Sequence, residues 1–325
     1  MPNVMVWVDR LEKSYGSIIA LDSISFSVAA GRIFGLLGPN GAGKTTAIKI
    51  LTTLARPDAG TAEIAGIDVL RDPVKVRGLI GYVPQELTVD PYLTAREHLR
   101  YYGDLYHLSA TLREARMREL LSLVGLIGHE DRRVRTFSGG MKKKLDLACG
   151  LLHRPPLILL DEPSLGLDVR GRHDVWSYIL YLKDQGATVL LCTNYMDEAE
   201  RLCDEVAIID RGRIAAIGTP AALKSELKRD VISVELSASN DHHGEKLAAL
   251  EQAVSKLGMV RAIAKDGTQL KIYVESNEMA LPQILQSAAA LTVPIQAITY
   301  SRPSLDEVFL HHTGHSFAER NEPRG

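Results

Sequence analysis

Eight consecutive residues between Gly38 and Thr45 have the types and the spacing that bind phosphate. They read Gly-Pro-Asn-Gly-Ala-Gly-Lys-Thr and fit the pattern G-x-x-x-x-G-K-[ST]. Glycines let backbone N–H groups converge on phosphate oxygens, and a helix that begins there adds the positive end of its dipole. We predict that Lys44 contacts the β- and γ-phosphates of a nucleotide and that the Thr45 hydroxyl is a ligand of Mg²⁺. The predicted phosphate-binding residues are Gly38, Pro39, Asn40, Gly41, Ala42, Gly43, Lys44, Thr45 and Thr46.

The segments on either side separate this loop from a glycine-rich turn that happens to carry a surface lysine. The apolar run 33–37 predicts a buried strand, and residues 46–51 predict a helix. Strand, loop and helix are the context that a phosphate-binding loop requires.

Two adjacent carboxylates follow a second predicted buried strand. The run 157–160 is apolar and leads directly into Asp161 and Glu162. In α/β sheets, ligands bind at the C-terminal ends of the strands. We predict that Asp161 holds Mg²⁺ through water and that Glu162 is catalytic, polarising the water that attacks the γ-phosphate. An acidic helix start after a core strand is the alternative, and the phosphate-binding pattern in the same chain disfavours it.

Composition excludes several classes of protein. The chain has 325 residues, 46% of them apolar, and a net charge of −2. This length predicts one large domain and one smaller one. We expect no nucleic-acid partner, because the chain has no basic excess. Three scattered cysteines predict neither a disulfide framework nor a zinc site. A signal peptide and a membrane-spanning run of about 18 apolar residues are both missing from the pattern, so we expect a cytoplasmic protein.

The order of predicted elements indicates an α/β fold with a mainly parallel sheet, because helical patterns separate the buried strands. Three helical patterns follow one another between about 89 and 153 without a strand, which predicts an all-helical insert. The first domain is predicted to span 1–225 and to end in a hairpin.

A second, accessory or regulatory domain is predicted over residues 230–312. Its pattern has the order β-α-β-β-α-β, which is typical of a ferredoxin-like α+β unit. Ser304 and Glu307 have the spacing of a capping box at the start of a final helix. The polar residues 313–325 are predicted to form a disordered tail.

With these motifs in this order, residues 4 to about 220 resemble the nucleotide-binding subunits of ABC transporters. The discriminating segment is Phe137–Met141, which matches the signature loop of that family, whereas many P-loop enzymes share the other motifs. The resemblance implies a P-loop NTPase core of the RecA-like type, with a helical subdomain that carries the signature.

The resemblance also implies roles for residues outside the phosphate loop. Tyr15 would stack on adenine, and Gln85 would contact Mg²⁺ and sense a membrane partner. Ser138 and the amides of Gly139 and Gly140 would meet the γ-phosphate of ATP held by a second copy of the chain. The loop 164–168 would cross the interface between the two copies. A serine-capped helix after a glycine turn is the structural alternative for the signature.

Two positions depart from the family pattern. Met141 replaces the usual glutamine, and 137–144 looks like the daunorubicin-resistance branch of ABC-2-type exporters. The three lysines that follow Met141 are typical of a solvated helix face. Asn194 stands where the family has a histidine that contacts the γ-phosphate. We predict a catalytic role for Asn194 with slower hydrolysis, since its amide donates a hydrogen bond but carries no charge. The alternative is that Asn194 caps a helix opening at Tyr195.

We therefore predict an ATP-binding and ATP-hydrolysing subunit that powers an ABC-2-type exporter of drugs, antibiotics or lipid-like molecules. Its partners would be a second copy of itself and a separately encoded membrane permease, at the cytoplasmic face of the membrane. The ending 304–310 resembles that of such exporter ATPases, and we expect its apolar face to pack on its own protein. The alternatives are a soluble, non-transport ABC ATPase acting on DNA or the ribosome, a low-turnover regulator gated by ATP, and an importer subunit.

Overall fold

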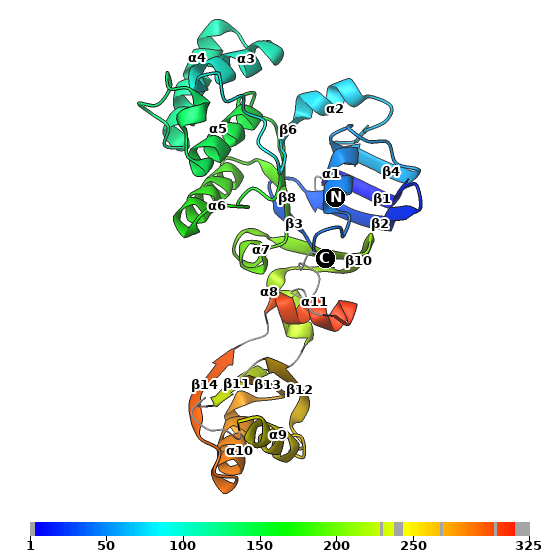
Figure 1. Cartoon of the computed structure of the whole chain (residues 1–325). Helices are drawn as coiled ribbons and strands as arrows, with labels where there is room; N and C mark the ends of the chain where they lie inside the picture. Colours follow the sequence, from blue (N-terminus) through cyan, green and yellow to red (C-terminus); the bar gives the residue numbers. More distant parts are fainter. Residues whose placement is uncertain (1–3, 228–229, 237–242, 267–268, 302–303, 316–325) are drawn as a thin grey trace. The chain divides into compact units, whose positions relative to one another are not determined.

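The computed structural model describes residues 4–227, 230–236, 243–266, 269–301 and 304–315. The larger of its two compact units contains a six-stranded sheet with the order β10-β9-β3-β8-β7-β6. Figure 1 labels four of these strands, β3, β6, β8 and β10. The strands are β3 (Ile33–Leu37), β6 (Ile80–Val83), β7 (Leu157–Asp161), β8 (Thr188–Thr193), β9 (Glu205–Asp210) and β10 (Arg213–Gly218). All neighbours pair in parallel except β9 and β10, which form the predicted hairpin.

A second, antiparallel sheet of four strands has the order β2-β1-β4-β5. The strands are β1 (Val4–Tyr15), β2 (Ile18–Ala29), β4 (Ala59–Ile64) and β5 (Ile67–Asp68). The helix α1 (Lys44–Leu51) shares a buried cluster with both sheets, and Phe26 of β2 stacks on Phe34 of β3 with ring centroids 5.3 Å apart. This shared core fixes the start of α1 beside the ends of the central strands.

The helical insert is confirmed. It contains α3 (Ala95–Leu105), α4 (Ala110–Leu123), a 3₁₀ turn at Val134–Thr136 and α5 (Gly139–Leu151). Thr94 and Glu97 form a capping box that starts α3, and Ser109 caps α4. Three further helices before residue 220 lie outside the insert: α2 (Pro73–Leu79), α6 (Val169–Asp184) and α7 (Met196–Leu202).

Residues 221–314 form a second compact unit. Its elements are α8 (Pro220–Glu226), β11 (Asp230–Leu236), α9 (His243–Val254), β12 (Val260–Asp266), β13 (Gln269–Val274), α10 (Asn277–Ala290), β14 (Ile295–Ser301) and α11 (Leu305–Thr313). The antiparallel sheet has the order β12-β13-β11-β14, and the chain order from β11 to β14 is the predicted β-α-β-β-α-β. The ferredoxin-like prediction is confirmed.

The second unit buries its own core. Side chains of α9 and α10 join those of β11 and β13 in one cluster, which includes Leu250, Ile284, Ile232 and Ile272. The capping box at the start of α11 is present, since the backbone N–H of Glu307 donates to the Ser304 hydroxyl at 3.4 Å and that of Ser304 donates to the Glu307 carboxylate at 3.0 Å. The apolar face of α11, made by Leu305, Val308 and Phe309, is fully buried.

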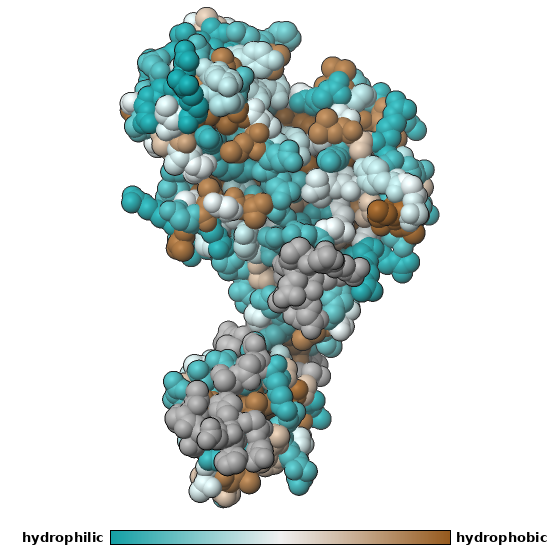
Figure 2. All heavy atoms as spheres, in the orientation of Figure 1, coloured by the Kyte–Doolittle hydropathy of each residue, from teal (hydrophilic) through white to brown (hydrophobic). Residues whose placement is uncertain are grey.

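The predicted tail at 313–325 lies largely outside the described residues. Thr313 ends α11, and the His315 ring lies 3.0 Å from the Asp210 carboxylate. Hydrophilic residues cover most of the visible surface, with smaller hydrophobic patches between them (Figure 2). Over the described ranges, no helix combines the length and the apolar character needed to cross a membrane.

Candidate functional site

The phosphate loop joins the end of β3 to the start of α1, as the sequence predicted. Two of its glycines are required by the backbone. A Cβ on Gly38 would lie 2.2 Å from the carbonyl oxygen of Ile209, and Gly43 has a φ of +113°, which favours glycine. Gly43 is also the N-cap of α1, so the positive end of the helix dipole faces the loop.

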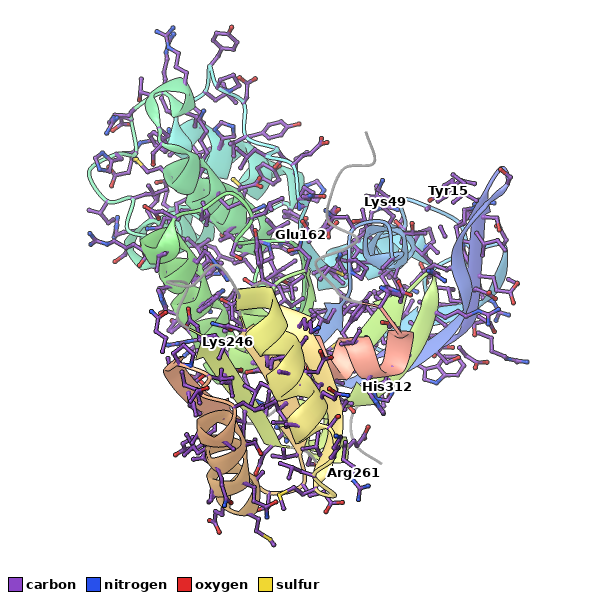
Figure 3. All side chains as sticks on the ribbon, turned by 60° about the horizontal axis from the view of Figure 1, so that its bottom comes forward. Tyr15, Lys49, Glu162, Lys246, Arg261 and His312 are labelled. Carbon is purple, nitrogen blue, oxygen red and sulfur yellow. The ribbon has the colours of Figure 1, made fainter. Side chains whose placement is uncertain are left out.

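Lys44 points into the loop from the first turn of α1. Its Nζ donates to the carbonyl oxygens of Gly38 at 2.7 Å and Pro39 at 3.1 Å, and it lies 3.4 Å from Glu162 Oε1. The side chain is buried, whereas Lys49 on the same helix is exposed (Figure 3). Lys44 is thus a buried cation whose present partners are loop carbonyls and one carboxylate, all of which phosphate oxygens can replace.

Asp161 ends β7 as a buried carboxylate. Among the described residues, neither of its oxygens makes a hydrogen bond of ordinary geometry, although the Thr45 hydroxyl lies near enough to lower its pKa. Burial raises the pKa of Asp161, and the nearby Thr45 hydroxyl and the charge of Lys44 counteract part of that rise. A hydroxyl beside an unpartnered carboxylate is a donor set that suits Mg²⁺, which binds few protein oxygens and completes its shell with phosphate and water. The described part of the chain contains no group of three or more His, Cys, Asp or Glu side chains placed to hold a metal.

Glu162 has an unusual backbone and two side-chain partners. Its φ is +49°, a left-handed conformation that is rare for glutamate and is found at functional sites. Its N–H donates to the carbonyl oxygen of Cys192 at 2.9 Å, which fixes the residue against β8. Oε1 faces Lys44, and Oε2 accepts a hydrogen bond from Gln85 Nε2 at 3.0 Å. The carboxylate is held at the junction of the central sheet and the helical insert (Figure 3).

Asn194 follows β8 and faces the phosphate loop. Its Nδ2 lies 3.5 Å from Asn40 Oδ1, and its own Oδ1 is buried with no hydrogen-bond partner in the described ranges. The alternative that Asn194 caps the next helix is wrong. The N-cap of α7 is Tyr195, it has no side-chain capping bond, and its N–H donates to the Thr193 hydroxyl at 3.0 Å. Thr193 provides the local bond of this turn, which leaves the Asn194 amide directed at the loop.

The signature and the adenine-side residues stand apart from this cluster. Ser138 caps α5 by accepting a hydrogen bond from the N–H of Met141 at 3.3 Å, and Ser138 and Gly139 are exposed. Tyr15 ends β1 with 48% of its surface exposed, and the amine of Lys13 lies 5.4 Å from the centre of its ring (Figure 3). One chain therefore brings together the phosphate loop, Gln85, both acids and Asn194. Over the described residues, no hydrogen bond connects Ser138 or Tyr15 to them.

The prediction that the lysine run 142–144 forms a solvated helix face is wrong for Lys143. Lys143 is buried, with 4% of its surface exposed, and its Nζ donates to the carbonyl oxygen of Pro84 at 2.8 Å. Lys144 is half-buried and pairs with Asp174. No spacing in the sequence singles out Lys143, because Lys144 likewise stands four residues before a buried residue, Ala148.

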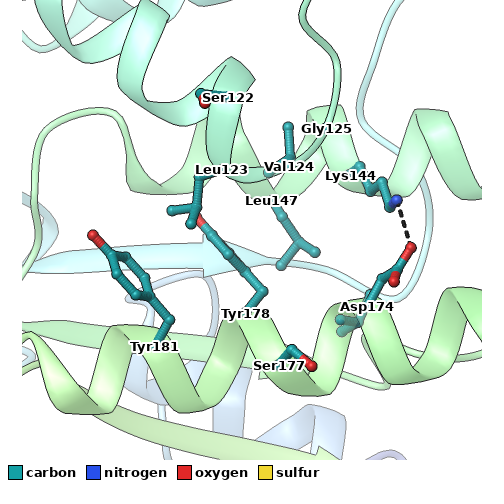
Figure 4. A pocket seen from close by; sticks show the side chains of 11 residues that line it. Ser122, Leu123, Val124, Gly125, Lys144, Leu147, Asp174, Ser177, Tyr178 and Tyr181 are labelled. Carbon is teal, nitrogen blue, oxygen red and sulfur yellow. Dashed lines mark hydrogen bonds and ion pairs between the residues drawn. The ribbon is translucent and has the colours of Figure 1, made fainter.

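A hollow of about 330 Å³ lies between the end of α4, α5 and α6 (Figure 4). Its walls include Leu123, Leu147 and the rings of Tyr178 and Tyr181, and the ion pair of Lys144 with Asp174 is drawn at its edge. None of the predicted site residues lines it, so it is separate from the cluster around Glu162.

Comparison with known proteins identifies the family. Residues 21–165 match the family described as ABC transporter, and residues 218–313 match the family described as ATP-binding protein DrrA1-3-like, C-terminal domain. The daunorubicin resistance ATP-binding protein DrrA3 of Streptomyces coeruleorubidus is 40% identical over 97% of both chains. The chain belongs to the ATP-binding subunits of ABC transporters. The linearmycin resistance ATP-binding protein LnrL of Bacillus subtilis is 34% identical to this ABC subunit, over 97% of it and 100% of LnrL.

Solved structures agree with this assignment. The ATP-binding subunit of an ABC transporter aligns with a TM-score of 0.63 and 34% identity, over 68% of this ABC subunit and 92% of that chain. A dimeric ATP-binding cassette bound to ADP and Pi in a post-hydrolysis state aligns with a TM-score of 0.62 and 25% identity, over 66% and 98%. The P-loop NTPase fold, the ABC-2-type branch and an ATP-hydrolysing role in export are confirmed.

Proposed function

We propose that this ABC subunit binds Mg²⁺–ATP between its own phosphate loop and the signature loop of a second copy. The observation that carries the proposal is the buried cluster in which Glu162 meets both Lys44 and Gln85, beside an unpartnered Asp161. Buried opposite charges at the C-terminal ends of parallel strands, next to a glycine loop, suit a nucleotide triphosphate and its metal.

Each predicted residue then has a role. The loop from Gly38 to Thr46 surrounds the phosphates with the backbone N–H groups that it has at every position except Pro39, and Lys44 contacts the β- and γ-phosphates. Thr45, Asp161 and Gln85 would hold Mg²⁺, which neutralises charge on the phosphates when it is bound. Glu162 orients and polarises the attacking water, and Asn194 donates a hydrogen bond to the γ-phosphate. Tyr15, which is exposed at the end of β1, stacks on adenine.

The second copy completes the site. Ser138 and Gly139 are exposed at the N-terminus of α5, where backbone amides and the helix dipole favour an anion. Their position supports a site shared by two chains, with the signature of each chain covering the nucleotide of the other.

A separately encoded ABC-2-type permease would form the transport path, and this subunit would bind it at the cytoplasmic face of the membrane. The relatives bear the names of resistance to daunorubicin and linearmycin and of Nod factor export. We infer that the cargo is a drug-like, antibiotic or lipid-like molecule. The neutral Asn194 favours a second candidate function, an ATP-gated regulator with low turnover. A direct measurement of the hydrolysis rate distinguishes such a regulator from a transport ATPase.

The decisive experiment is Glu162→Gln. This change keeps the shape of the side chain but removes the group that polarises water, so ATP should bind and trap a closed dimer. Gel filtration with and without Mg²⁺–ATP measures it, with Glu12→Gln at an exposed position of β1 as the matched control. A Glu162→Gln protein that hydrolyses ATP at the wild-type rate, or that stays monomeric at every nucleotide concentration, contradicts the proposal.

A further inference from the structure

The segment that carries Gln85 has no regular structure and is held by side chains of the helical insert. It follows β6 and runs from Pro84 to Asp90. Lys143 Nζ on α5 donates to the carbonyl oxygens of Pro84 at 2.8 Å and of Gln85 at 3.5 Å. Because these acceptors are backbone atoms, the contact fixes the path of the chain at Gln85, whatever its side chain does.

Two further buried side chains hold the same segment. Asp146, one turn after Lys143 on α5, accepts hydrogen bonds from the N–H of Thr88 at 3.3 Å and from its hydroxyl. His98 on α3 accepts a hydrogen bond from the N–H of Asp90 at 2.7 Å through Nε2. Three side chains of the insert therefore bind one loop. Two of them, Lys143 and Asp146, lie on α5, the signature helix, which begins after Ser138.

Lys143 is an unusual residue for such a place. A buried cation costs free energy unless it is paired, and Lys143 lies within 4.0 Å of no carboxylate among the described residues. Burial lowers the pKa of its amine, and the more distant charges of Asp146, Asp161 and Glu162 counteract this. Among the residues that the structure describes, its hydrogen-bond partners are the two backbone carbonyls. An apolar side chain would fill the position at less cost, which indicates that the hydrogen bonds themselves are what the residue provides.

The contacts form one continuous path. Ser138 caps α5, and Lys143 follows five residues later on the same rigid helix. Lys143 holds the backbone of Gln85, and Gln85 Nε2 holds Glu162 Oε2 at 3.0 Å. A rigid helix moves as a unit, so a displacement of Ser138 displaces Lys143 by the same motion.

We propose that Lys143 is a positioning residue that transmits the position of the signature helix to Gln85, so that seating of Ser138 on a partner's nucleotide sets the contact between Gln85 and Glu162. This inference rests on the proposed roles of Ser138 and Glu162. It assigns to Lys143 a part in the timing of hydrolysis, with no contact to ATP itself.

The test is a double-mutant cycle between Lys143→Met and Gln85→Ala. Methionine keeps the length of the apolar stem and removes the donor. Each single change should lower kcat by about tenfold or more, because a small misplacement of a catalytic group costs that order of rate, while the Kd for ATP stays within about twofold. The double variant should be no slower than the slower single variant, because Lys143 acts through Gln85.

Controls on the same helix sharpen the result. Lys144→Met removes the neighbouring lysine, whose amine pairs with Asp174 at 2.8 Å (Figure 4), and should leave kcat unchanged. Lys143→Arg keeps a donor to the carbonyls and should restore most of the rate. On a Glu162→Gln background, Lys143→Met should still form the ATP-dependent dimer, a readout that does not depend on turnover. If Lys143→Met does not fold, Lys143→Gln takes its place in the cycle.

Two outcomes overturn the inference. One is a wild-type kcat for Lys143→Met. The other is a double variant whose loss is the product of the two single losses, which would mean that Lys143 acts independently of Gln85. If Gln85→Ala and Glu162→Gln themselves leave turnover unchanged, the proposed function is wrong. That result differs from a failure of the inference about Lys143, in which these two variants lose turnover and Lys143→Met does not.

Discussion

Lys44 Nζ and Glu162 Oε1 lie 3.4 Å apart, and both side chains are buried. Opposite charges that lie so close in a buried place stabilise each other, and each would be costly if left alone. In the proposed function, Lys44 would exchange this carboxylate and the loop carbonyls for phosphate oxygens when ATP binds. The same exchange would free Glu162 to act on water, so the proposal couples nucleotide binding to activation of this carboxylate.

Lys44→Ala should abolish tight ATP binding. A hydrogen bond to a charged group contributes about 1.5–3 kcal/mol, and Lys44 would make more than one to the phosphates, so we expect the Kd to rise at least about a hundredfold. Titration of the purified protein with a fluorescent ATP analogue measures it. Lys49→Ala, an exposed lysine on the same helix, is the control and should bind normally. Wild-type affinity in Lys44→Ala would remove the phosphate-loop assignment.

Asn194→Ala should slow hydrolysis by about ten- to a hundredfold, which corresponds to a hydrogen bond of roughly 1.5–3 kcal/mol to a charged acceptor in the transition state. Asn194→His should match or exceed the wild-type rate, since imidazole also donates there. Because Asn194 does not cap α7, the melting temperature of Asn194→Ala should stay close to that of the wild type. A large loss of stability with normal turnover would show that the residue is structural.

Asp161→Asn should stabilise the nucleotide-free protein above the raised pKa of Asp161. Burial favours the protonated acid in the folded state, so ionisation of Asp161 costs stability once the pH has risen through its ordinary value of about 3.9 to the raised one. The gain from asparagine should therefore be full above the raised pKa and disappear as the pH falls toward 4. Thermal melting at several pH values checks this, and a difference that does not change with pH would contradict it.

The same variant should lose the dependence of ATP binding on Mg²⁺, because a neutral amide is a poor ligand for a hard cation. Titration with ATP in the presence of Mg²⁺ and, separately, of EDTA gives the ATP affinity with and without the metal. Equal Mg²⁺ dependence in Asp161→Asn and the wild type would mean that the metal lies elsewhere.

A chain that ends at Pro220 should fold and bind ATP. The compact units divide after this residue, and the core of the second unit draws on its own helices and strands. The sequence predicts a different boundary, between residues 225 and 230, and this boundary stays a prediction. Solubility, melting temperature and ATP affinity of the two truncations decide between them, and the contact of His315 with Asp210 is lost in both. Insoluble product from either boundary would make the second unit integral to the first.

Short-range patterns account for what the sequence alone determined. The phosphate loop, the apolar strand before Asp161 and the capping box at Ser304 each depend on residues a few positions apart, and each lies where it was predicted. The order of elements in the second unit was also predictable, because alternation and helical spacing are properties of single segments.

Only the tertiary structure decided which side chains of those segments meet. The run 142–144 contains three similar lysines, and the neighbours that α5 packs against determine that Lys143 alone is buried on the carbonyls of the Gln85 segment. Asn194 could cap a helix or face the loop, and the bond from the N–H of Tyr195 to Thr193 settled that choice. The contact of Gln85 with Glu162 joins segments far apart in the chain, so its geometry depends on how the insert packs on the central sheet. Such pairings require the folded chain, because no local spacing encodes them.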